Sequence, residues 1–191
     1  MGKLIVTEFI SVDGVIEDPG GAEEFDRGGW AFEFDRGEEG DRFKLEEVME
    51  AEAQLLGRVT YQGFAAAWPD REDEVGFAEK MNSMPKYVVS ATLERADWNN
   101  TRIVEGEVAA AIPRLKEEIE GDILVTGSAT LVHSLLEHDL ADELRLMVFP
   151  LILGAGKRLF RDGPDKAKLR LADARPVGSD GVVILTYQRV R

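Results

Sequence analysis

The feature that most constrains this sequence is a repeated order of apolar segment, glycine turn and helical pattern. Residues 53–56 (Ala-Gln-Leu-Leu) form a short apolar segment that ends at Gly57, and a helical pattern follows. Residues 122–126 (Asp-Ile-Leu-Val-Thr) form a second such segment, which ends at Gly127 and again opens a helical pattern. Short apolar runs of this kind are typical of buried parallel strands, whose connecting helices cover both faces of the sheet. The repeated order therefore predicts an α/β fold.

The rest of the chain extends this order in two ways. Up to Asp139 strand-like and helical segments alternate, whereas three strand-like segments follow it without a helix of any length between them. Residues 178–181 (Gly-Ser-Asp-Gly) suit a hairpin turn between the last two strands. We therefore expect one domain over residues 1–191, with a three-layer αβα arrangement around a mixed sheet whose C-terminal strands are antiparallel. Strands are expected over 4–10, 53–56, 86–90, 101–104, 122–126, 143–149, 168–177 and 182–189, and helices over 41–53, 107–119, 129–137 and in the segment that ends at Ala67.

Composition excludes several kinds of chemistry and of partner. The sequence has no cysteine, so a disulfide framework, a thiolate zinc site, an iron–sulfur cluster and a cysteine nucleophile are excluded. Asp and Glu number 37 against 23 Lys and Arg, and the net charge of -14 disfavours nucleic acid and anionic membrane surfaces as partners. His133 and His138 do not share a helix face as a metal pair would, so no metal is expected. Residues 1–7 enter a strand without a secretory signal, and no apolar run reaches membrane-spanning length, so a cytoplasmic protein is expected.

Three segments follow predicted strands at the edge of the sheet where open α/β proteins bind ligands. They are residues 57–60, 90–92 and 127–130. The glycine that opens the first and third segments lets the backbone approach a phosphate closely, and each precedes a helix whose positive N-terminal end favours anionic oxygens. A pyrophosphate could bridge these two turns, and Arg58 adds a fixed positive charge. Hydroxyl donors are supplied by Thr60, Ser90, Thr92, Ser128 and Thr130.

The alternative for each segment is ordinary capping by Gly, Ser and Thr. Three such segments, each after a strand, favour a dinucleotide with an extra ribose phosphate. The sequence contains neither the G-x-G-x-x-G pattern of common dehydrogenases nor the G-x-x-x-x-G-K-[ST] pattern of P-loop nucleotidases. Neither of those two classes is therefore supported.

Five short motifs occur in a specific order along nearly the whole chain. They are residues 11–16 (Ser-Val-Asp-Gly-Val-Ile), 56–61 (Leu-Gly-Arg-Val-Thr-Tyr), 87–90 (Tyr-Val-Val-Ser), 125–131 (Val-Thr-Gly-Ser-Ala-Thr-Leu) and 149–156 (Phe-Pro-Leu-Ile-Leu-Gly-Ala-Gly). Together they resemble the dihydrofolate-reductase-like family, which includes the C-terminal reductase domain of bacterial riboflavin-biosynthesis deaminase-reductases. The resemblance implies the fold of that family, NADPH as the cofactor and a homodimer, for which the apolar segment before Gly154 is a candidate contact.

The resemblance also implies positions for the cofactor. It puts residues 57–60 and 127–131 around the pyrophosphate and residues 90–92 near the ribose phosphate of the adenosine. It puts the turn over 13–16 beside the nicotinamide. The cofactor-binding residues that it implies are Gly14, Val15, Ile16, Gly57, Arg58, Val59, Thr60, Ser90, Ala91, Thr92, Gly127, Ser128, Ala129, Thr130 and Leu131.

The resemblance does not fix the substrate. Riboflavin-type reductases carry a His-x-Leu-Arg-Ala-like helix and an Asp-Asp-Pro-x-Leu-Thr-like segment for the sugar phosphate, and residues 43–53 and 68–74 show neither pattern. Folate-reducing members carry a buried carboxylate on the first helix. Asp41 lies at a comparable distance before Gly57, but the pattern around it differs. We therefore expect a stand-alone member of the family that does not reduce dihydrofolate.

Residues near the end of the first strand are candidates for the reaction itself. Hydride transfer needs no protein nucleophile, but an acid that donates a proton or orients the substrate assists it. Asp13 is the candidate for this catalytic role, with a plain Asp-Gly turn as the alternative. Glu8 can also point towards the pocket, although a buried carboxylate needs a partner that the sequence does not identify. A flat substrate is expected to contact Trp30, Tyr61, Trp68, Phe149 and Pro150, with packing in the core as the alternative for the aromatic residues.

The sequence thus predicts an NADPH-dependent reductase that transfers a hydride to a small heterocyclic or carbonyl substrate of a pyrimidine-like or pterin-like kind. Two other hypotheses remain open. A non-catalytic protein with this fold would bind NADPH without oxidising it. An α/β dimer with an interaction role, whose glycine turns only cap helices, would bind no dinucleotide. A flavin or deazaflavin in place of NADPH also remains open.

Overall fold

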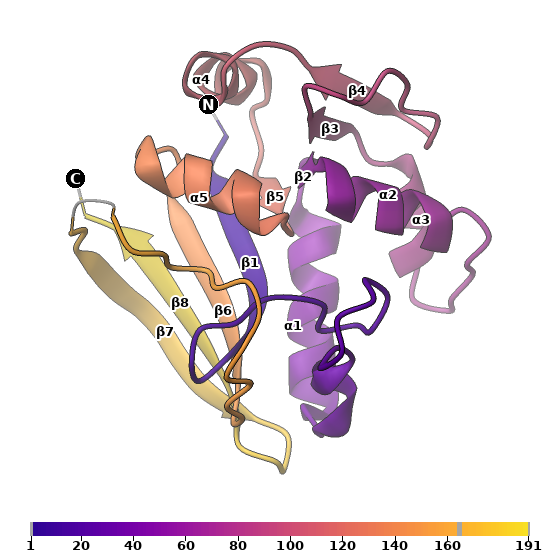
Figure 1. Cartoon of the computed structure of the whole chain (residues 1–191). Helices are drawn as coiled ribbons and strands as arrows, with labels where there is room; N and C mark the ends of the chain where they lie inside the picture. Colours follow the sequence, from indigo (N-terminus) through magenta and orange to yellow (C-terminus); the bar gives the residue numbers. More distant parts are fainter. Residues whose placement is uncertain (1, 164–165, 191) are drawn as a thin grey trace.

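The structure is a computed structural model that describes residues 2–163 and 166–190. Within these ranges eight strands form one mixed sheet in the order β4-β3-β2-β5-β1-β6-β8-β7 (Figure 1). The strands are β1 (Leu4–Ser11), β2 (Ala53–Gly57), β3 (Lys86–Val89), β4 (Thr101–Val104), β5 (Ile123–Val125), β6 (Glu143–Phe149), β7 (Leu169–Val177) and β8 (Val182–Arg189). The helices are the short 3-10 helix η1 (Trp30–Glu33), α1 (Gly37–Glu50), α2 (Arg58–Ala67), α3 (Phe77–Ser83), α4 (Val108–Glu118) and α5 (Ala129–Glu137).

Strand β1 occupies the middle of the sheet because its side chains are buried on both faces. It pairs in parallel with β5 on one side and with β6 on the other. Leu4 and Val6 pack into the hydrophobic cluster of one face, and Ile5 packs into the cluster of the opposite face. A strand that is apolar towards both faces is stable only with layers above and below it, so β1 fixes a three-layer arrangement.

Helices supply both outer layers, as the sequence predicts. On one face α1, α2 and α3 contribute Val48, Tyr61 and Met81 to a single buried cluster. On the other face α4 and α5 contribute Ile112 and Leu135. The predicted three-layer α/β architecture is therefore confirmed.

One of the three C-terminal strands, β6, runs in a direction that differs from the prediction. Strand β8 is antiparallel to both of its neighbours, and the predicted hairpin joins it to β7 between Val177 and Val182. Strand β6, however, runs parallel to β1. The reason is that α5 precedes β6 and forms a crossover, which returns the chain to the same edge of the sheet before the next strand begins. Among the three C-terminal strands, only β8 therefore opposes the direction of β1.

Helix α3 has no counterpart among the helices expected from the sequence. Its two ends are held by side chains from outside the helix. The Asp73 carboxylate accepts a hydrogen bond from the Ala78 N–H at 2.6 Å, and this bond is the main cause that lowers the pKa of Asp73. At the other end the buried Lys86 ammonium donates to three carbonyl groups of residues 81–84 at 2.8–3.1 Å. These contacts cross between elements, so helical periodicity alone does not reveal them.

Replacing Lys86 by Met should destabilise the protein, because Met keeps the apolar stem but donates no hydrogen bond. Three carbonyl groups at the end of α3 would lose their donor, and we expect the free energy of unfolding to fall by about 1–3 kcal/mol. Urea denaturation followed by tryptophan fluorescence measures this change. The exposed Glu79 on the same helix offers a control, since Glu79→Gln should change the free energy by less than about 0.5 kcal/mol. Equal stability of Lys86→Met and the native protein would contradict the capping role.

Candidate functional site

Two glycine turns meet at the carboxyl ends of neighbouring strands. Strand β2 pairs with β5, so Gly57 lies next to the cis-linked turn Gly127–Ser128 that follows β5. The Gly57 N–H donates a hydrogen bond to the Gly127 carbonyl at 3.1 Å. A Cβ atom on Gly57 would lie 2.2 Å from Ser128 Oγ, which is too close to pack, and Gly127 has a φ of +101°, where glycine is favoured. Glycine at both positions therefore lets the N-terminal ends of α2 and α5 touch.

The first turns of these two helices lack side-chain caps from the described residues. Gly57 and Ser128 are the N-cap residues of α2 and α5, and within the described chain neither makes a side-chain capping hydrogen bond. Capping by the Ser128 hydroxyl, the alternative role of this segment, is therefore absent. Thr60 Oγ1 lies 2.9 Å from the position that a Cβ atom on Gly127 would take, so a hydroxyl faces the same junction. Two helix N-termini with uncapped N–H groups favour an anion between them.

The other predicted polar residues surround this junction in different ways. Arg58 is exposed at the first position of α2, where its guanidinium donates to Gln62 Oε1 at 3.1 Å. The Ser90 hydroxyl, after β3, accepts hydrogen bonds from the N–H groups of Thr92 (3.2 Å) and Leu93 (3.0 Å). Ser90 thus closes a local turn and caps no helix, since the described residues between β3 and β4 form no helix. Arg58 lies at the surface, and Gln62, which accepts its hydrogen bond, belongs to the same helix.

Several of the predicted cofactor-binding residues have buried side chains. Val15, Ile16, Ala129 and Leu131 are at most 9% exposed and belong to the hydrophobic clusters. Any contact that they make with a ligand is through the backbone. Gly14 has a φ of +83° and open space on the side where a Cβ atom would project. Its N–H donates to the Ser11 carbonyl at 3.0 Å, and its carbonyl accepts from the Leu159 N–H at 2.9 Å.

Asp13 ties the turn after β1 to the segment that follows β6. Its carboxylate accepts hydrogen bonds from the Ser11 hydroxyl at 2.6 Å and from the N–H groups of Leu153 (3.1 Å) and Gly154 (2.8 Å). The Ser11 hydrogen bond is the largest influence on the pKa of Asp13, which falls to about 2. At neutral pH Asp13 is therefore an ionised acceptor that can orient a group but holds no proton to donate. Its catalytic role stays a prediction. Of the two roles considered, proton donation and orientation of the substrate, only orientation suits an ionised carboxylate.

Two of the residues expected to contact the substrate are core residues. Trp30 and Phe149 pack edge to face with ring centroids 5.4 Å apart, and they are 1% and 0% exposed. The Trp30 indole N–H donates to the Glu17 carbonyl at 3.0 Å, which satisfies its one donor. Pro150 is exposed directly after β6. Packing in the core, the alternative role, accounts for both aromatic side chains.

The other two aromatic residues lie in a different cluster. Tyr61 is the buried residue of α2, 4% exposed, and its hydroxyl accepts a hydrogen bond from the Trp98 N–H at 3.1 Å. Trp68, just after α2, packs against Phe77 at a centroid distance of 5.2 Å. The clusters of Tyr61 and Trp30 lie in separate parts of the core. The five residues are therefore not brought together around one pocket.

The buried carboxylate of α1 is Glu47 rather than Asp41. The Asp41 side chain is 66% exposed and accepts a hydrogen bond from Arg36 Nε at 2.6 Å. Glu47 is 3% exposed, and its Oε2 accepts a hydrogen bond from the Thr7 hydroxyl at 3.0 Å and lies 2.5 Å from Lys44 Nζ. Glu47 comes three residues after Lys44 and thus shares its helix face. That spacing is the sequence signal that could have identified it.

Buried polar atoms without partners among the described residues lie where β1 runs past the end of β5, those of Glu8 and Glu47 on opposite faces of the strand. Among the described residues, Glu8 Oε1, Glu47 Oε1 and Thr126 Oγ1 have no hydrogen-bond partner. Strands β1 and β5 are paired up to Val6 and Val125, so Glu8 and Thr126 lie just beyond the last paired residues. Buried polar atoms without partners are costly unless a ligand or water satisfies them. This end of the two strands is therefore a candidate site for a polar ligand.

The pKa of the Glu8 carboxyl group is shifted strongly by its surroundings. Burial raises the pKa of Glu8 from 4.5 to about 8, Lys44 opposes the rise, and Glu23 and Glu47 add to it. The carboxyl group is therefore largely protonated at neutral pH. The sequence identified no partner for this carboxyl group, and among the described residues its Oε1 atom has none.

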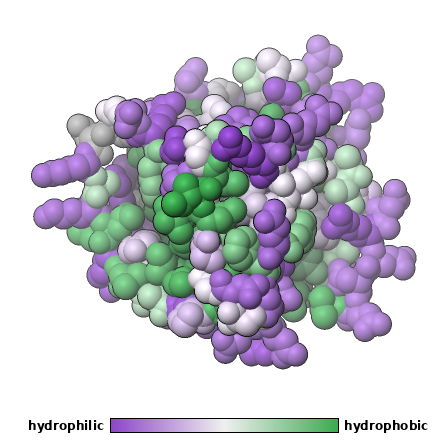
Figure 2. Space-filling model, turned by 60° about the horizontal axis from the view of Figure 1, so that its bottom comes forward, coloured by the Kyte–Doolittle hydropathy of each residue, from purple (hydrophilic) through white to green (hydrophobic). Residues whose placement is uncertain are grey.

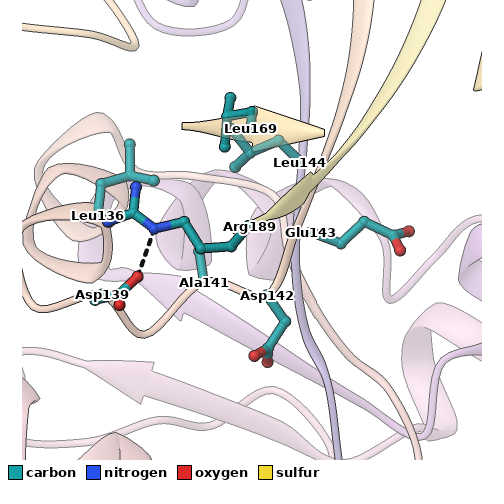
Figure 3. A pocket seen from close by; sticks show the side chains of 8 residues that line it. All are labelled: Leu136, Asp139, Ala141, Asp142, Glu143, Leu144, Leu169 and Arg189. Atoms are coloured by element: carbon teal, nitrogen blue, oxygen red, sulfur yellow. Dashed lines mark hydrogen bonds and ion pairs between the residues drawn. The ribbon is translucent and has the colours of Figure 1, made fainter. Parts of the chain in front are cut away.

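Among the hollows bordered by the described residues, two that lie away from this junction are next to β8. The ion pair between Arg189 Nε and Asp139 Oδ1 (2.5 Å) borders a crevice of about 10 Å³ between β8 and the end of α5 (Figure 3). A space of that size holds at most one water molecule and is no ligand site. A larger groove of about 390 Å³ runs between α1 and strands β6, β7 and β8, and Glu47 lies on its border.

The end of the sheet that carries the turn after β1 also presents apolar side chains to solvent. Figure 2 shows hydrophobic residues gathered on the face turned forward there. Val12 and Ile152 are 62% and 77% exposed, and the Val12 N–H donates to the Leu151 carbonyl at 3.0 Å. These two exposed side chains thus come from adjoining segments, which we call the Val12–Ile152 patch.

The described part of the chain contains no group of three or more His, Asp or Glu side chains arranged to hold a metal ion. His133 Nε2 lies 2.7 Å from the Arg158 carbonyl, and His138 Nδ1 lies 2.8 Å from the Ser134 carbonyl. In the same residues no helix has the length and hydrophobicity needed to span a bilayer.

The sheet order and the two joined helix N-termini define an α/β protein of the dihydrofolate-reductase-like fold. The model of the RibD C-terminal domain family matches residues 2–183, and the chain belongs to this family. The resemblance drawn from the five motifs is thereby confirmed.

Related sequences and structures extend over most of the chain. It is 31% identical to the uncharacterized protein YyaP of Bacillus subtilis (strain 168) over 136 residues, which are 70% of this chain and 71% of YyaP. It is 26% identical to the uncharacterized protein YwjB of the same organism over 187 residues, or 98% of each chain. A protein from Shewanella sp. PV-4, provisionally assigned to riboflavin biosynthesis, has a TM-score of 0.78 at 21% identity over 99% of both chains. A pyrimidine reductase-like protein from Corynebacterium diphtheriae has a TM-score of 0.63 at 13% identity, over 100% of this chain and 92% of that one. These likenesses to solved structures support the fold.

The raised pKa of Glu8 predicts a pH-dependent stability that Glu8→Gln removes. The folded protein holds the Glu8 proton up to about pH 8, whereas the unfolded chain releases it near 4.5. Its contribution is fully present below about pH 4.5 and is lost as the pH rises through 8, at up to about 1.4 kcal/mol per pH unit. The difference in unfolding free energy between native protein and Glu8→Gln should therefore fall across this range. Urea denaturation of both proteins from pH 5 to pH 9 measures it, and parallel curves would contradict the assignment.

Proposed function

We propose that the protein is an NADPH-dependent reductase that transfers a hydride to a small nitrogen heterocycle or carbonyl compound of a pyrimidine-like or pterin-like kind. The contact between the glycine turns of β2 and β5 carries this proposal, because it joins two uncapped helix N-termini at the edge of the sheet where ligands bind. Membership of the RibD C-terminal domain family adds support, as do the similar structures of a protein provisionally assigned to riboflavin biosynthesis and of a pyrimidine reductase-like protein.

The residues at the junction suit a dinucleotide. A Cβ atom at Gly57 would fill the space beside Ser128, and buried polar atoms nearby lack partners among the described residues. We propose that the backbone at Gly57 and Gly127–Ser128, with the Thr60 hydroxyl, holds the pyrophosphate. The exposed Arg58 would hold the extra phosphate that distinguishes NADPH from NADH. When bound, the cofactor supplies the hydride, and the protein supplies position and electrostatics.

We propose that the other predicted segments complete this site. Residues 90–92 would lie near the ribose phosphate of the adenosine and the turn over residues 13–16 beside the nicotinamide. The hydrogen bonds of Asp13 to Leu153 and Gly154 support an orienting role, since they hold this turn in one position.

We propose that Glu47 contacts the substrate. Its Oε1 atom has no partner among the described residues and can accept a hydrogen bond from a ring N–H. The Lys44 ammonium, 2.5 Å from Oε2, balances the charge of the carboxylate in this buried place, and the Thr7 hydroxyl fixes its orientation. A heterocycle with a polar ring edge fits such a group better than an apolar substrate does.

Replacing Arg58 by Ala should weaken NADPH binding by about tenfold and NADH binding by less than about threefold, because only NADPH loses a charge-assisted contact. Calorimetry and quenching of tryptophan fluorescence measure both dissociation constants, and oxidation of NADPH with heterocyclic acceptors measures turnover. Arg170→Ala, which removes an exposed guanidinium from β7, is the matched control and should leave both constants unchanged. Equal weakening of the two cofactors would contradict the role of Arg58. Native protein that binds neither cofactor would contradict the reductase proposal.

We also propose that the protein forms a homodimer through the Val12–Ile152 patch, because adjoining exposed apolar side chains mark surfaces that associate. Size-exclusion chromatography with light scattering should then give twice the chain mass of 21.2 kDa for the native protein and the chain mass for Ile152→Asp. Val190→Asp, at an exposed position just after β8, serves as the control and should remain dimeric. A native protein of single-chain mass would contradict the dimer.

A further inference from the structure

The Glu8 side chain reaches the junction of the two helices from the strand beneath it. Glu8 is only 8% exposed, although it is a charged residue type in the central strand. Continuing the register of Val6 with Val125 puts Glu8 beside Gly127, on the face of β1 opposite to Thr7 and its bond with Glu47.

The space left by the missing side chain of Gly127 has two polar neighbours. A Cβ atom built there would lie 2.9 Å from Thr60 Oγ1 and 3.9 Å from Glu8 Oε1. The Thr60 hydroxyl belongs to the first turn of α2, and Gly127 leads into α5. Glu8 Oε1 is buried and has no partner among the described residues. A carboxyl oxygen that needs a hydrogen-bond partner is thus aimed at the place where two helix N-termini favour an anion.

We propose that Glu8 is a ligand-binding residue whose Oε1 atom forms a hydrogen bond with a phosphate oxygen of the ligand held between the N-terminal ends of α2 and α5. The proposal rests on the proposed function in that the ligand is taken to be a dinucleotide. It adds an acid to a site that otherwise consists of backbone N–H groups, hydroxyls and Arg58.

The chemistry of the pair fixes the position of the proton. A phosphate diester oxygen only accepts hydrogen bonds at neutral pH, so the Glu8 carboxyl group must be the donor. Burial is the largest influence on Glu8 and raises its pKa to about 8. The charged groups that also act on it are Lys44 from α1, which lowers the pKa, and Glu47 from α1 and Glu23 from the loop after β1, which raise it. Below that pH the neutral acid donates to the phosphate. Above it, a carboxylate faces a phosphate in a buried place and repels it, so binding and proton uptake are linked.

The test compares dissociation constants of NADPH, NADH and inorganic pyrophosphate from pH 6 to pH 9.5 for native protein, Glu8→Gln and Glu8→Leu. Taking the ratio between native protein and variant at each pH cancels the ionisation of the probe. We expect Glu8→Gln to bind within about threefold of the native protein at pH 6.5, because the amide N–H replaces the acid as donor. Between pH 8 and 9.5 the native protein should lose affinity relative to Glu8→Gln by up to about tenfold per pH unit. Glu8→Leu should bind about tenfold more weakly at pH 6.5.

Glu143→Gln is the matched control, since Glu143 is a strand carboxylate of similar burial (7% exposed) that pairs with Arg145 in β6. It should keep the native pH profile. If the affinity of Glu8→Gln depends on pH in the same way as that of the native protein, the proposal is overturned and the reductase function is unaffected. Binding of pyrophosphate with the Glu8-dependent profile but no binding of either dinucleotide would support the role of Glu8 and refute the proposed function. No binding of any of the three probes would overturn both.

Discussion

The structure depends on the contact between Gly57 and the Gly127–Ser128 turn. Strands β2 and β5 are neighbours in the sheet, so the segments that follow them leave the sheet at the same point. Each of these segments begins a helix there. A side chain on Gly57 would collide with Ser128 Oγ at 2.2 Å, and the positive φ of Gly127 disfavours other residues. At the same junction both helices begin without a side-chain cap from the described residues. A packing requirement thereby creates a place for an anion.

The central strand imposes a second constraint, because it carries polar residues into a region that excludes water. Thr7 and Glu8 follow three apolar residues of β1 and lie where β5 has already ended. Thr7 faces α1 and forms hydrogen bonds with Lys44 and Glu47, whereas Glu8 faces the helix junction and its Oε1 atom has no partner among the described residues. An apolar side chain at either position would stabilise the core more readily. Their presence is understandable if the end of β1 serves a ligand on both of its faces.

The parts of the fold that the sequence predicts are those encoded by neighbouring residues. The two strand–glycine–helix units, the hairpin between β7 and β8 and the bounds of α5 all follow from local patterns. The features that it misses depend on contacts between distant segments: α3 is held by Asp73 and Lys86, and β6 is parallel to β1 because α5 forms a crossover. The same limit applies to the site. Local turns identify the glycine junction, but only the folded chain separates the Trp30 and Tyr61 clusters and singles out Glu47 as the buried carboxylate of α1.

Two carboxyl groups at the end of β1 show how one strand can supply opposite protonation states. Asp13 is surrounded by donors, and hydrogen bonds that favour the charged form lower its pKa to about 2. Glu8 is buried, no described residue donates to its Oε1 atom, and burial raises its pKa to about 8. The difference arises from surroundings rather than residue type, which is how enzymes separate the roles of paired acids. At neutral pH the ionised Asp13 fixes the loop after β6, and the neutral Glu8 keeps a proton at the helix junction. An anionic ligand can therefore approach this edge of a protein of net charge -14 without meeting a buried negative charge at Glu8.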